Sequence, residues 1–410
     1  MNASYPPHEI RVVLFESIHA RATQLLGKEG YTLTTHAGMP SGKELIDLAQ
    51  GAHIVGIRSK TQLDAEFFAA APDLGTVGCF CIGTNQVDLK AASDRGVVVF
   101  NAPFANTRSV AELTMAEIIA LHRGLVQRSM ALHQGRWTKS AKGCHEVRGR
   151  TLGIVGYGRI GSQASVLAEA LGMRVVFHDI VDCLAHGNAA RLPSLDEVLS
   201  ASDVVTLHVP ATPETKNLIG RRELGLMKPG SFLINNARGD VVDLVALREA
   251  LDSQHLAGAA IDVFPSEPAS NDTSFEVPLA GCANVILTPH VGGSTAEAQE
   301  NIAVEVCTKL AKFMNNGSTT TSVNFPEVEL PQLHPKHHRI LHYHHNVPGV
   351  LSRMHRIISD LGVNISAEFL QSNPRHSYVI MDVEATHGGT FLEQLREIPE
   401  TIRARMLWCP

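Results

Sequence analysis

The sequence predicts an α/β chain in three parts: a Rossmann-type doubly wound parallel sheet, a second, flavodoxin-like α/β part, and a ferredoxin-like βαββαβ part. Three observations predict this. Apolar runs alternate with helical patterns over the first hundred residues and again from about 150 to 290, which implies parallel sheets covered by helices. A glycine-rich turn joins the first strand and helix of the second set. Beyond residue 337 the order is strand, helix, strand, strand, helix, strand.

The composition is that of a globular protein with two or three domains: 410 residues, 44% hydrophobic and 19% charged. A formal charge of -6 argues against nucleic acid as a partner. The N-terminal residues lack a signal-peptide pattern and no apolar run reaches bilayer length, so we expect a cytoplasmic protein without a membrane partner. Seven cysteines without a CxxC pair predict reduced thiols and no metal site.

The first part contains the strand-like runs RVVLFE, HIVGIR, LGTVGCF and VVVFN, with the helical patterns HARATQLLGKEG and NQVDLKAASDRG between them. A capping box formed by Ser109 and Glu112 is expected to open the helix that leads into the second part.

The second part contains six strand-like runs: TLGIVGYG, MRVVFHD, DVVTLHVP, SFLINNA, AGAAIDV and NVILTPH. Six strands in this rhythm fit the dinucleotide-binding sheet. Ser294 and Thr295 can cap the long helix that leads out of it. The polar, proline-dotted stretch 316–337 is interpreted as a linker to the last part.

The glycine-rich turn consists of Gly156, Tyr157, Gly158, Arg159, Ile160 and Gly161, and Asp179 ends the next strand-like run. The glycines permit a tight turn and the close approach of a pyrophosphate to the amides at a helix start. Asp179 would accept hydrogen bonds from a ribose and, with no Arg or Lys next to it in the sequence, would repel a 2′-phosphate. The pattern predicts NAD as the cofactor; the alternative is a glycine-rich turn beside a surface aspartate.

Three polar residues lie just past the ends of apolar runs: Arg238 after SFLINNA, Glu267 after AGAAIDV and His290 after NVILT. If these runs are neighbouring parallel strands, the side chains meet at the carboxyl edge of the sheet, where such folds bind ligands. An imidazole can take the hydroxyl proton of an alcohol that loses a hydride, a carboxylate can orient the imidazole, and a guanidinium can bind a substrate carboxylate. Singly they could be a helix-flanking charge, a loop acid and a packed strand-end residue; together they predict a catalytic site.

The segments GYGRIG, NNARGD, DVFPSEP and LTPHVGGST resemble the D-isomer-specific 2-hydroxyacid dehydrogenase family. RSKT, CFCIGTNQVD, NAPFANTRSVAEL and NVPGVL are similar to members that carry a single C-terminal ACT domain and act on 3-phosphoglycerate. The likeness covers essentially the whole chain. It implies NAD-dependent oxidation of 3-phospho-D-glycerate to 3-phosphooxypyruvate, the entry to L-serine synthesis, by a homotetramer.

The resemblance also implies a domain division and residue roles. A discontinuous substrate domain, 1–106 with 293–326, would enclose an NAD-binding domain, 107–292, and an ACT domain would follow at 337–410. Arg238 and His290 would be catalytic, with Glu267 supporting His290. Further cofactor contacts are implied for Asn236, Ala237, Asp262, Gly292 and Gly293, and a substrate contact for Asn106.

A phosphorylated acid needs a second cationic contact, and Arg58, Ser59 and Lys60, at the end of a strand-like run, offer two charges and a hydroxyl that we expect to face the same cleft. The alternative is a solvated basic turn. Relatives usually have Arg-Ser-Arg here, and Lys60 offers no bidentate fork. NNARG also replaces the commoner NASRG, while Arg238 is kept.

In the last part, His344 and Asn346 end a strand just before Pro348 and Gly349 open a helix, and Asn364 begins the next strand. A free helix N-terminus can bind a carboxylate and asparagine side chains can hold an ammonium. Similarity to serine-binding ACT domains predicts L-serine as an effector that inhibits the enzyme. The alternative is that Asn346 only caps the helix.

Histidines cluster around the start of this part, at 334, 337, 338, 342, 344 and 345. They lack accompanying cysteines or close carboxylates, so we interpret them as a polar, pH-sensitive surface rather than a metal site.

Two alternative functions remain open. One is another D-2-hydroxyacid dehydrogenase, such as a glyoxylate or hydroxypyruvate reductase, against which the basic turn and the ACT-like tail argue. The other is an NAD(H)-sensing binding protein, against which the complete Arg, Glu and His set argues.

Overall fold

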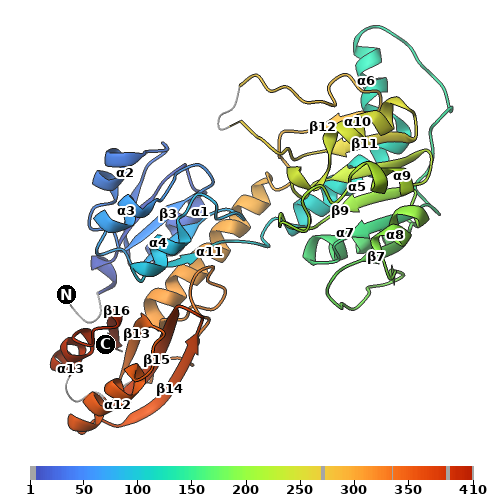
Figure 1. The fold of residues 1–410 in the computed structure, drawn as a ribbon. Helices are drawn as coiled ribbons and strands as arrows, with labels where there is room; N and C mark the ends of the chain where they lie inside the picture. Colours follow the sequence, from blue (N-terminus) through green and yellow to red (C-terminus); the bar gives the residue numbers. More distant parts are fainter. Residues whose placement is uncertain (1–5, 269–272, 335, 385–387, 409–410) are drawn as a thin grey trace. The chain divides into compact units, whose positions relative to one another are not determined.

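The fold is described from a computed structural model that covers residues 6–268, 273–334, 336–384 and 388–408 (Figure 1). The chain divides into two compact units: one is built from the residues up to Ala105 and from Gln299 onward, the other from Asn106–Ala298. The first unit holds a five-stranded and a four-stranded sheet, and the second holds a seven-stranded sheet.

The five-stranded sheet is parallel with the order β2-β1-β3-β4-β5, which confirms the flavodoxin-like prediction. Its strands are β1 Arg11–Leu14, β2 Thr32–Thr35, β3 Ile54–Ile57, β4 Thr76–Cys79 and β5 Val98–Phe100. The helices of this part are α1 Ala20–Lys28, α2 Gly42–Ala49, α3 Ala65–Ala70, α4 Leu89–Asp94 and α11 Ala296–Asn316. The sequence analysis did not identify β2, α2 or α3; β2 is mostly exposed and so has no apolar run.

The seven-stranded sheet is also parallel, with the order β12-β11-β10-β9-β6-β7-β8. Its strands are β6 Thr151–Val155, β7 Arg174–His178, β8 Ala190–Arg191, β9 Val204–Leu207, β10 Ser231–Asn235, β11 Leu256–Ile261 and β12 Val285–Leu287. Its helices are α5 Thr107–Arg123, α6 Leu125–His133, α7 Arg159–Ala170, α8 Leu195–Ala201, α9 Arg221–Leu226 and α10 Leu244–Asp252. The order reverses between β6 and β9, as in dinucleotide-binding sheets, and β8 is an additional short edge strand.

The predicted capping box at Ser109 is wrong. The N-cap of α5 is Asn106, three residues before Ser109, and no side chain caps the helix. The Ser109 hydroxyl instead lies 2.8 Å from the Thr295 hydroxyl, and Glu112 pairs with Arg108 on the helix surface. The other predicted cap is confirmed, because Thr295 Oγ1 accepts the Ala298 amide of α11 at 3.1 Å.

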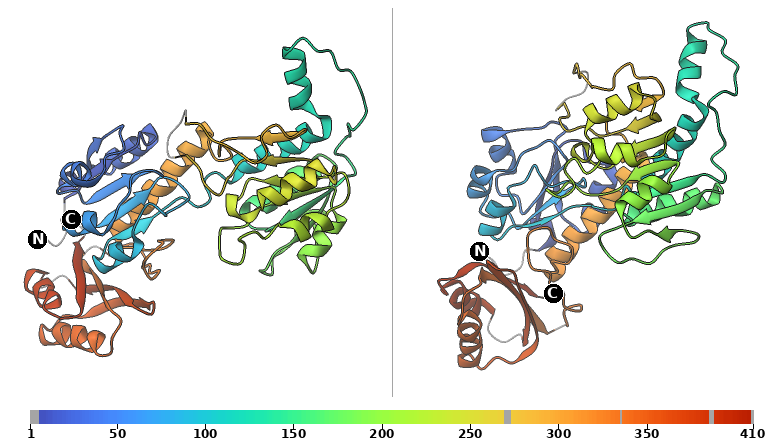
Figure 2. Two further views of the ribbon diagram at one scale, coloured as in Figure 1. Left: turned by 45° about the horizontal axis from the view of Figure 1, so that its top comes forward. Right: turned by 45° about the vertical axis from the view of Figure 1, so that its right-hand side comes forward.

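The C-terminal sheet is antiparallel with the order β14-β15-β13-β16. Its elements are β13 His337–His345, α12 Val350–Asp360, β14 Ile365–Ser372, β15 His376–Glu384, α13 Gly388–Arg396 and β16 Thr401–Trp408. This order confirms the βαββαβ prediction. Helices α12 and α13 lie together at one face of the sheet (Figures 1 and 2).

Both faces of β13 are buried from Arg339 to His344, so the interpretation of the histidine tract as a surface is wrong for His342 and His344. His334 and His345 are exposed, and His337 and His338 are partly exposed. Tyr343 faces one core, where it stacks on Phe325 with ring centroids 3.9 Å apart. Ile340 faces the other core, under α12 and α13. Because side chains alternate along a strand, His342 and His344 follow Ile340 and are only 0% and 4% exposed.

The stretch interpreted as a linker is folded onto the first unit rather than extended through solvent. Asn324 Oδ1 accepts the Val99 amide at the end of the five-stranded sheet, at 2.9 Å, and Thr319 Oγ1 donates to the Pro326 carbonyl at 2.7 Å. Phe325 is 7% exposed. The stretch therefore fixes the C-terminal part to the α/β part of the same unit.

None of the helices in the described ranges combines the length and apolarity that crossing a bilayer requires. The six cysteines that the structure describes are all unbridged, as the sequence predicts.

Candidate active site

The three polar residues predicted to converge do follow three neighbouring strands. β10, β11 and β12 pair in parallel and nearly level, with Asn235 beside Ile261 and Ile261 beside Leu287. The chain leaves all three strands at the carboxyl edge, where open α/β sheets bind ligands. This edge of the second unit is the candidate active site.

His290 and Glu267 form a hydrogen-bonded pair at this edge. Glu267 Oε2 lies 2.8 Å from His290 Nδ1, while Glu267 Oε1 accepts the Phe264 amide at 3.1 Å. The side chains are 49% and 34% exposed. Because the carboxylate occupies Nδ1, the ring is oriented with Nε2 available to a ligand.

Asp262 holds the loop that carries His290. Its carboxylate accepts hydrogen bonds from the Thr288 hydroxyl at 2.6 Å and from the Val291 and Gly292 amides at 2.8 Å each. Its carbonyl accepts the His290 amide, also at 2.8 Å. His290 has a φ of 54°, in the left-handed region that non-glycine residues rarely adopt. Asp262 is 1% exposed, so the bonds from this buried carboxylate stabilise an otherwise unfavourable backbone.

Arg238 lies at the end of β10 and is exposed. Its carbonyl accepts the Asn235 side-chain amide at 2.9 Å, and its Nη1 donates to the Ala237 carbonyl at 2.6 Å. The next residue must be glycine, since a Cβ at Gly239 would collide with the backbone of Phe264 and Pro265. That close approach packs the Arg238 turn against the loop that leads from β11 to Glu267.

The glycine-rich turn has the geometry of a pyrophosphate cradle. Gly156 has a φ of 91°, and a Cβ there would lie 2.6 Å from the His208 carbonyl oxygen, whereas a Cβ at Gly158 would meet open space. Helix α7 begins directly after Gly158 and has no side-chain cap, so the amides of its first turn, at Arg159, Ile160 and Gly161, face the turn. An anionic pyrophosphate fits here.

Asp179 ends β7 beside this turn. Its Oδ2 accepts the Tyr157 amide at 2.6 Å and its Oδ1 accepts the Val181 amide at 2.8 Å. The half-buried carboxylate retains lone pairs for ribose hydroxyls. The residues present therefore fit both the pyrophosphate and the ribose of NAD.

A cation that the sequence pattern does not predict lies close to Asp179. The short strand β8 pairs with β7 and brings Arg191 to the Asp179 carbonyl, to which its Nη2 donates at 3.2 Å. Its Nη1 pairs with Asp182 at 2.5 Å. Arg191 lies 12 residues from Asp179 in the chain, and only the pairing of the strands could have indicated the contact.

Asn236 and Ala237 are buried behind the edge. The Asn236 side-chain amide donates to Glu117 Oε2 at 2.7 Å and to Thr114 Oγ1 at 3.1 Å, both on α5. Burial raises the pKa of Glu117 to about 7, with the nearby charge of Asp262 acting in the same direction. The Asn236 side chain is thus directed to the helix, and its backbone is the part left to meet a cofactor.

Asn106 and Gly293, predicted to contact substrate and cofactor, lie next to each other in this unit. Asn106, 7% exposed at the start of α5, packs against Gly293, where its side chain occupies the space that a Cβ would need.

Arg58, Ser59 and Lys60 lie in the first unit, directly after β3. Arg58 is half-buried and the other two are exposed. Within the described residues, neither the guanidinium nor the ammonium group has a hydrogen-bonding or ion-pairing partner. Both cationic groups can therefore bind an anion.

The predicted effector residues lie at opposite ends of the C-terminal sheet: His344 and Asn346 at the end of β13, and Asn364 beside Glu384, which pairs with His337 at the start of β13. His344 is buried, with its Nδ1 3.0 Å from His342 Nδ1. Asn346 is exposed and its side chain donates to the Asn373 carbonyl at 2.9 Å, and Asn364 is exposed beside Glu384 at 3.4 Å. The capping alternative for Asn346 is wrong, because the N-cap of α12 is Gly349 and no side chain caps it.

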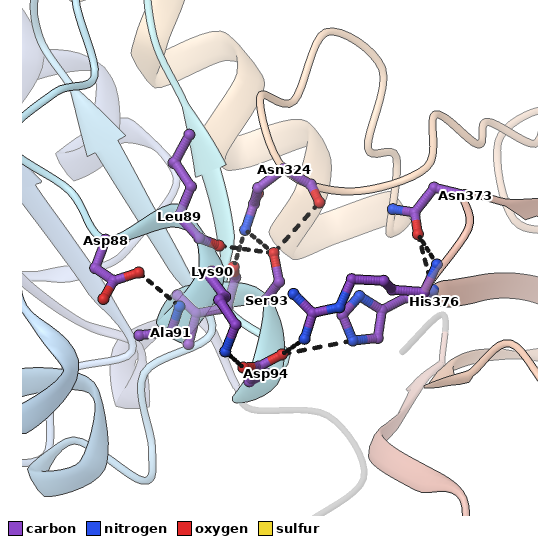
Figure 3. A network of polar contacts seen from close by, with 11 residues as sticks. Asp88, Leu89, Lys90, Ala91, Ser93, Asp94, Asn324, Asn373 and His376 are labelled. Atoms are coloured by element: carbon purple, nitrogen blue, oxygen red, sulfur yellow. Dashed lines mark hydrogen bonds and ion pairs between the residues drawn. The ribbon is translucent and has the colours of Figure 1, made fainter.

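The turn bonded to Asn346 also contacts the α/β part of its unit. The Asn346 amide donates to the Arg375 carbonyl at 2.9 Å, and the Arg375 guanidinium pairs with Asp94 of α4 at 3.0 Å. Lys90 and His376 also approach Asp94, at 3.0 and 3.7 Å (Figure 3). Asn346 is therefore one turn away from a contact with α4, in the part of the same unit that holds the five-stranded sheet.

Comparisons with known proteins agree with this geometry. Residues 115–292 match the family model described as D-isomer specific 2-hydroxyacid dehydrogenase, NAD binding domain, and residues 340–403 match an AHAS small subunit-like ACT domain. The chain is 53% identical to a D-3-phosphoglycerate dehydrogenase of Haemophilus influenzae over 98% of both chains. Among solved structures, D-2-hydroxyisocaproate dehydrogenase aligns with a TM-score of 0.70 at 25% identity, covering 77% of this chain and 99% of that one. The NAD complex of a Staphylococcus aureus NAD-dependent formate dehydrogenase aligns with a TM-score of 0.62 at 30% identity, covering 74% and 96%.

Proposed function

The chain belongs to the D-isomer specific 2-hydroxyacid dehydrogenase family, and from this premise we propose that it oxidises 3-phospho-D-glycerate to 3-phosphooxypyruvate with NAD, the first step of L-serine biosynthesis. The single observation that carries the chemistry is the His290–Glu267 pair, 2.8 Å apart, at the carboxyl edge of the dinucleotide-binding sheet. Full-length similarity to D-3-phosphoglycerate dehydrogenases supports the substrate.

His290 is the general base of the proposed reaction. Bound NAD supplies the acceptor for the hydride that leaves carbon 2 of the substrate. The hydroxyl proton on that carbon goes to His290 Nε2, because Glu267 holds Nδ1 and stabilises the imidazolium that forms. In the reverse direction the same nitrogen returns the proton to the new alkoxide.

Arg238 binds the substrate carboxylate in this proposal. Its planar fork suits a carboxylate, and its positive charge also polarises the adjacent carbonyl that forms at carbon 2. Because Gly239 packs directly against the Phe264 backbone, the turn that carries Arg238 lies close to the loop that carries Glu267.

We assign the substrate phosphate to Arg58, Ser59 and Lys60, with Asn106 as a further substrate contact. The cationic groups of Arg58 and Lys60, which have no partner in the part of the chain that the structure describes, support this assignment. The nicotinamide side of NAD is assigned to the backbone of Asn236 and Ala237 and to Asp262, Gly292 and Gly293.

We further propose feedback inhibition by L-serine, bound at the ACT domain near Asn346 and Asn364, in a cytoplasmic homotetramer. The exposed amide group of Asn346, just before α12, supports the serine site. Asn364 lies at the opposite end of the same sheet, so within one chain a serine bound at Asn346 is remote from it. His344 would shape this site from beneath, since its ring is buried. In functional terms the proposed division is a substrate domain, 1–106 with 293–326, an NAD-binding domain, 107–292, and a regulatory domain, 337–410.

One assay tests both levels of the proposal: phosphoglycerate-dependent formation of NADH, with and without L-serine. Turnover that serine suppresses is the expected result. In Asn346→Ala, serine inhibition should weaken at least tenfold while uninhibited kcat stays within about twofold. Unaltered inhibition would refute the effector site, and tight NADH binding without turnover of any 2-hydroxy acid would instead favour the NAD(H)-sensing alternative.

A further inference from the structure

A buried carboxylate organises the loop to which the substrate phosphate is assigned. Glu16 follows β1 and is 8% exposed. Its Oε1 accepts the amides of Arg58 at 3.1 Å and Thr61 at 2.8 Å, and its Oε2 accepts the amide of Lys60 at 3.1 Å. One side chain therefore fixes the backbone on both sides of Ser59.

The backbone carbonyl group of Arg58, in the same loop, is also hydrogen-bonded by side chains. The Gln86 side chain donates to the Arg58 carbonyl at 2.6 Å, and the Cys81 thiol donates to it at 3.5 Å. Both backbone groups of Arg58 are thus bound by side chains that follow β1 and β4. Only its guanidinium remains without a partner in the described structure.

Glu16 holds this position in an unfavourable backbone conformation. Its φ is 63° and that of Ser17 is 49°, both in the left-handed region, where a non-glycine residue costs on the order of 1 kcal/mol or more. Such strain persists where surrounding interactions compensate for it. The bonds between Glu16 and the loop are interactions of that kind.

The direction of the loop amides decides how an anion can be bound. Consecutive backbone amides can form an anion-binding nest, but here the amides of Arg58, Lys60 and Thr61 point to Glu16. A phosphate is therefore left to the Arg58 and Lys60 side chains and to Ser59, and the spacing of these groups depends on the backbone that Glu16 fixes.

We infer that Glu16 is a positioning residue for recognition of the substrate phosphate, acting through the Arg58 and Lys60 side chains without touching the substrate. The inference rests on the proposed function and deepens it. In this inference, part of the affinity for the phosphorylated substrate depends on Glu16, a carboxylate that follows β1, the strand next to β3.

The test is a double-mutant cycle on KM for 3-phosphoglycerate at saturating NAD, using full-length Glu16→Ala, Arg58→Ala and the double variant. Glu16→Ala should raise this KM about tenfold or more while kcat and the KM for NAD stay within about twofold. Glu16→Gln keeps an acceptor for two of the three amides and should fall between Glu16→Ala and wild type. In the Arg58→Ala background, replacing Glu16 should change KM far less, because the group through which it acts is gone.

Asp64→Ala is the matched control, since Asp64 also accepts a backbone amide in this unit, that of Phe67 at 2.9 Å, but caps α3 instead of the basic loop. It should leave KM unchanged. Additive effects of Glu16 and Arg58 on KM would overturn the inference, as would an unchanged KM in Glu16→Ala. A wild-type enzyme that does not oxidise phosphoglycerate would instead refute the proposed function.

Discussion

Two hydrogen-bonded pairs that contain histidine, His290 with Glu267 and His342 with His344, have opposite surroundings. His290, at the edge of the seven-stranded sheet, is about half exposed and bonds to the carboxylate of Glu267. His342 and His344, inside the C-terminal sheet, are buried and bond to each other through their Nδ1 atoms at 3.0 Å. The first ring is hydrogen-bonded to a carboxylate and is half exposed, whereas the second pair is buried and His342 Nε2 lies 2.8 Å from the Thr401 hydroxyl.

The difference shows that environment decides what a histidine can do. Burial lowers the pKa of His342 to about 3, with its neighbour His344 adding to the effect. Burial likewise lowers the pKa of His344 to about 4. These rings are kept neutral and serve the fold. At the sheet edge, an imidazole that bonds to a carboxylate on one nitrogen and is open on the other is suited to exchange protons with a substrate.

The largest effect of a substitution is expected on kcat, at the His290–Glu267 pair. His290→Ala should lower kcat by about 10²- to 10⁴-fold, the range for loss of a positioned general base, with NAD affinity little changed. Steady-state kinetics and NAD titration measure both. His8→Ala, an exposed histidine of the other unit, is the control and should retain full activity; equal losses in the two variants would contradict a specific role.

The buried pair should affect stability rather than turnover. Because the folded-state pKa values of His342 and His344 lie below the ordinary value of 6.5, only the unfolded chain takes up protons as the pH falls below 6.5. Stability should be complete above that pH and decline toward pH 4, by roughly 1 kcal/mol per pH unit for each ring. Thermal unfolding at pH 7.5, 6 and 5 tests this. His342→Gln should flatten the dependence, and a wild-type melting temperature that stays constant or rises on acidification would contradict it.

A buried acid in the second unit should show the opposite pH dependence. The pKa of Glu117 is raised to about 7 by burial, so the folded state favours the neutral acid. Its contribution to stability should be full below about pH 4.5 and be lost as the pH rises through 7. Glu117→Gln should therefore be less sensitive to pH than wild type between about pH 4.5 and 7. The same slope in both proteins would assign the dependence to other groups.

The smallest effect is expected at the exposed ion pair between Arg375 and Asp94, where the side chains are 55% and 35% exposed. Exposed pairs contribute about 0–1 kcal/mol because solvent and salt screen them. Arg375→Gln, which leaves the contacts of Asp94 with Lys90 and His376 in place, should change the free energy of unfolding by less than about 1 kcal/mol, and added salt should reduce the difference further. A loss of several kcal/mol in urea titrations would show that the contact is stronger than its exposure implies.

The sequence predicted the parts of the molecule that rest on short-range patterns. Apolar runs identified β10, β11 and β12, and the rule that parallel strands share a carboxyl edge brought Glu267 and His290 together. The same rule could have identified Glu16, which ends the run RVVLFE beside the strand that precedes Arg58. It was missed because a single glutamate after a strand carries no motif.

Other features depend on long-range packing that local patterns do not encode. Asp262 is seen to hold the His290 loop only when residues 26 to 30 positions apart come into contact. The burial of His342 and His344 depends on α12, α13 and the folded stretch after α11, which cover both faces of β13. The failed capping box at Ser109 shows that a correct local pattern can be overridden when the helix starts earlier.

The most direct test of the account is a comparison of kcat/KM for 3-phospho-D-glycerate and unphosphorylated D-glycerate with NAD. An enzyme with a catalytic His290–Glu267 pair and a basic loop for the phosphate should prefer the phosphorylated substrate by at least about 10²-fold, because loss of the phosphate leaves the contacts of Arg58 and Lys60 unmade. Near-equal values would contradict the phosphate assignment, and no NADH formation from either acid would contradict the proposed catalytic role of the pair.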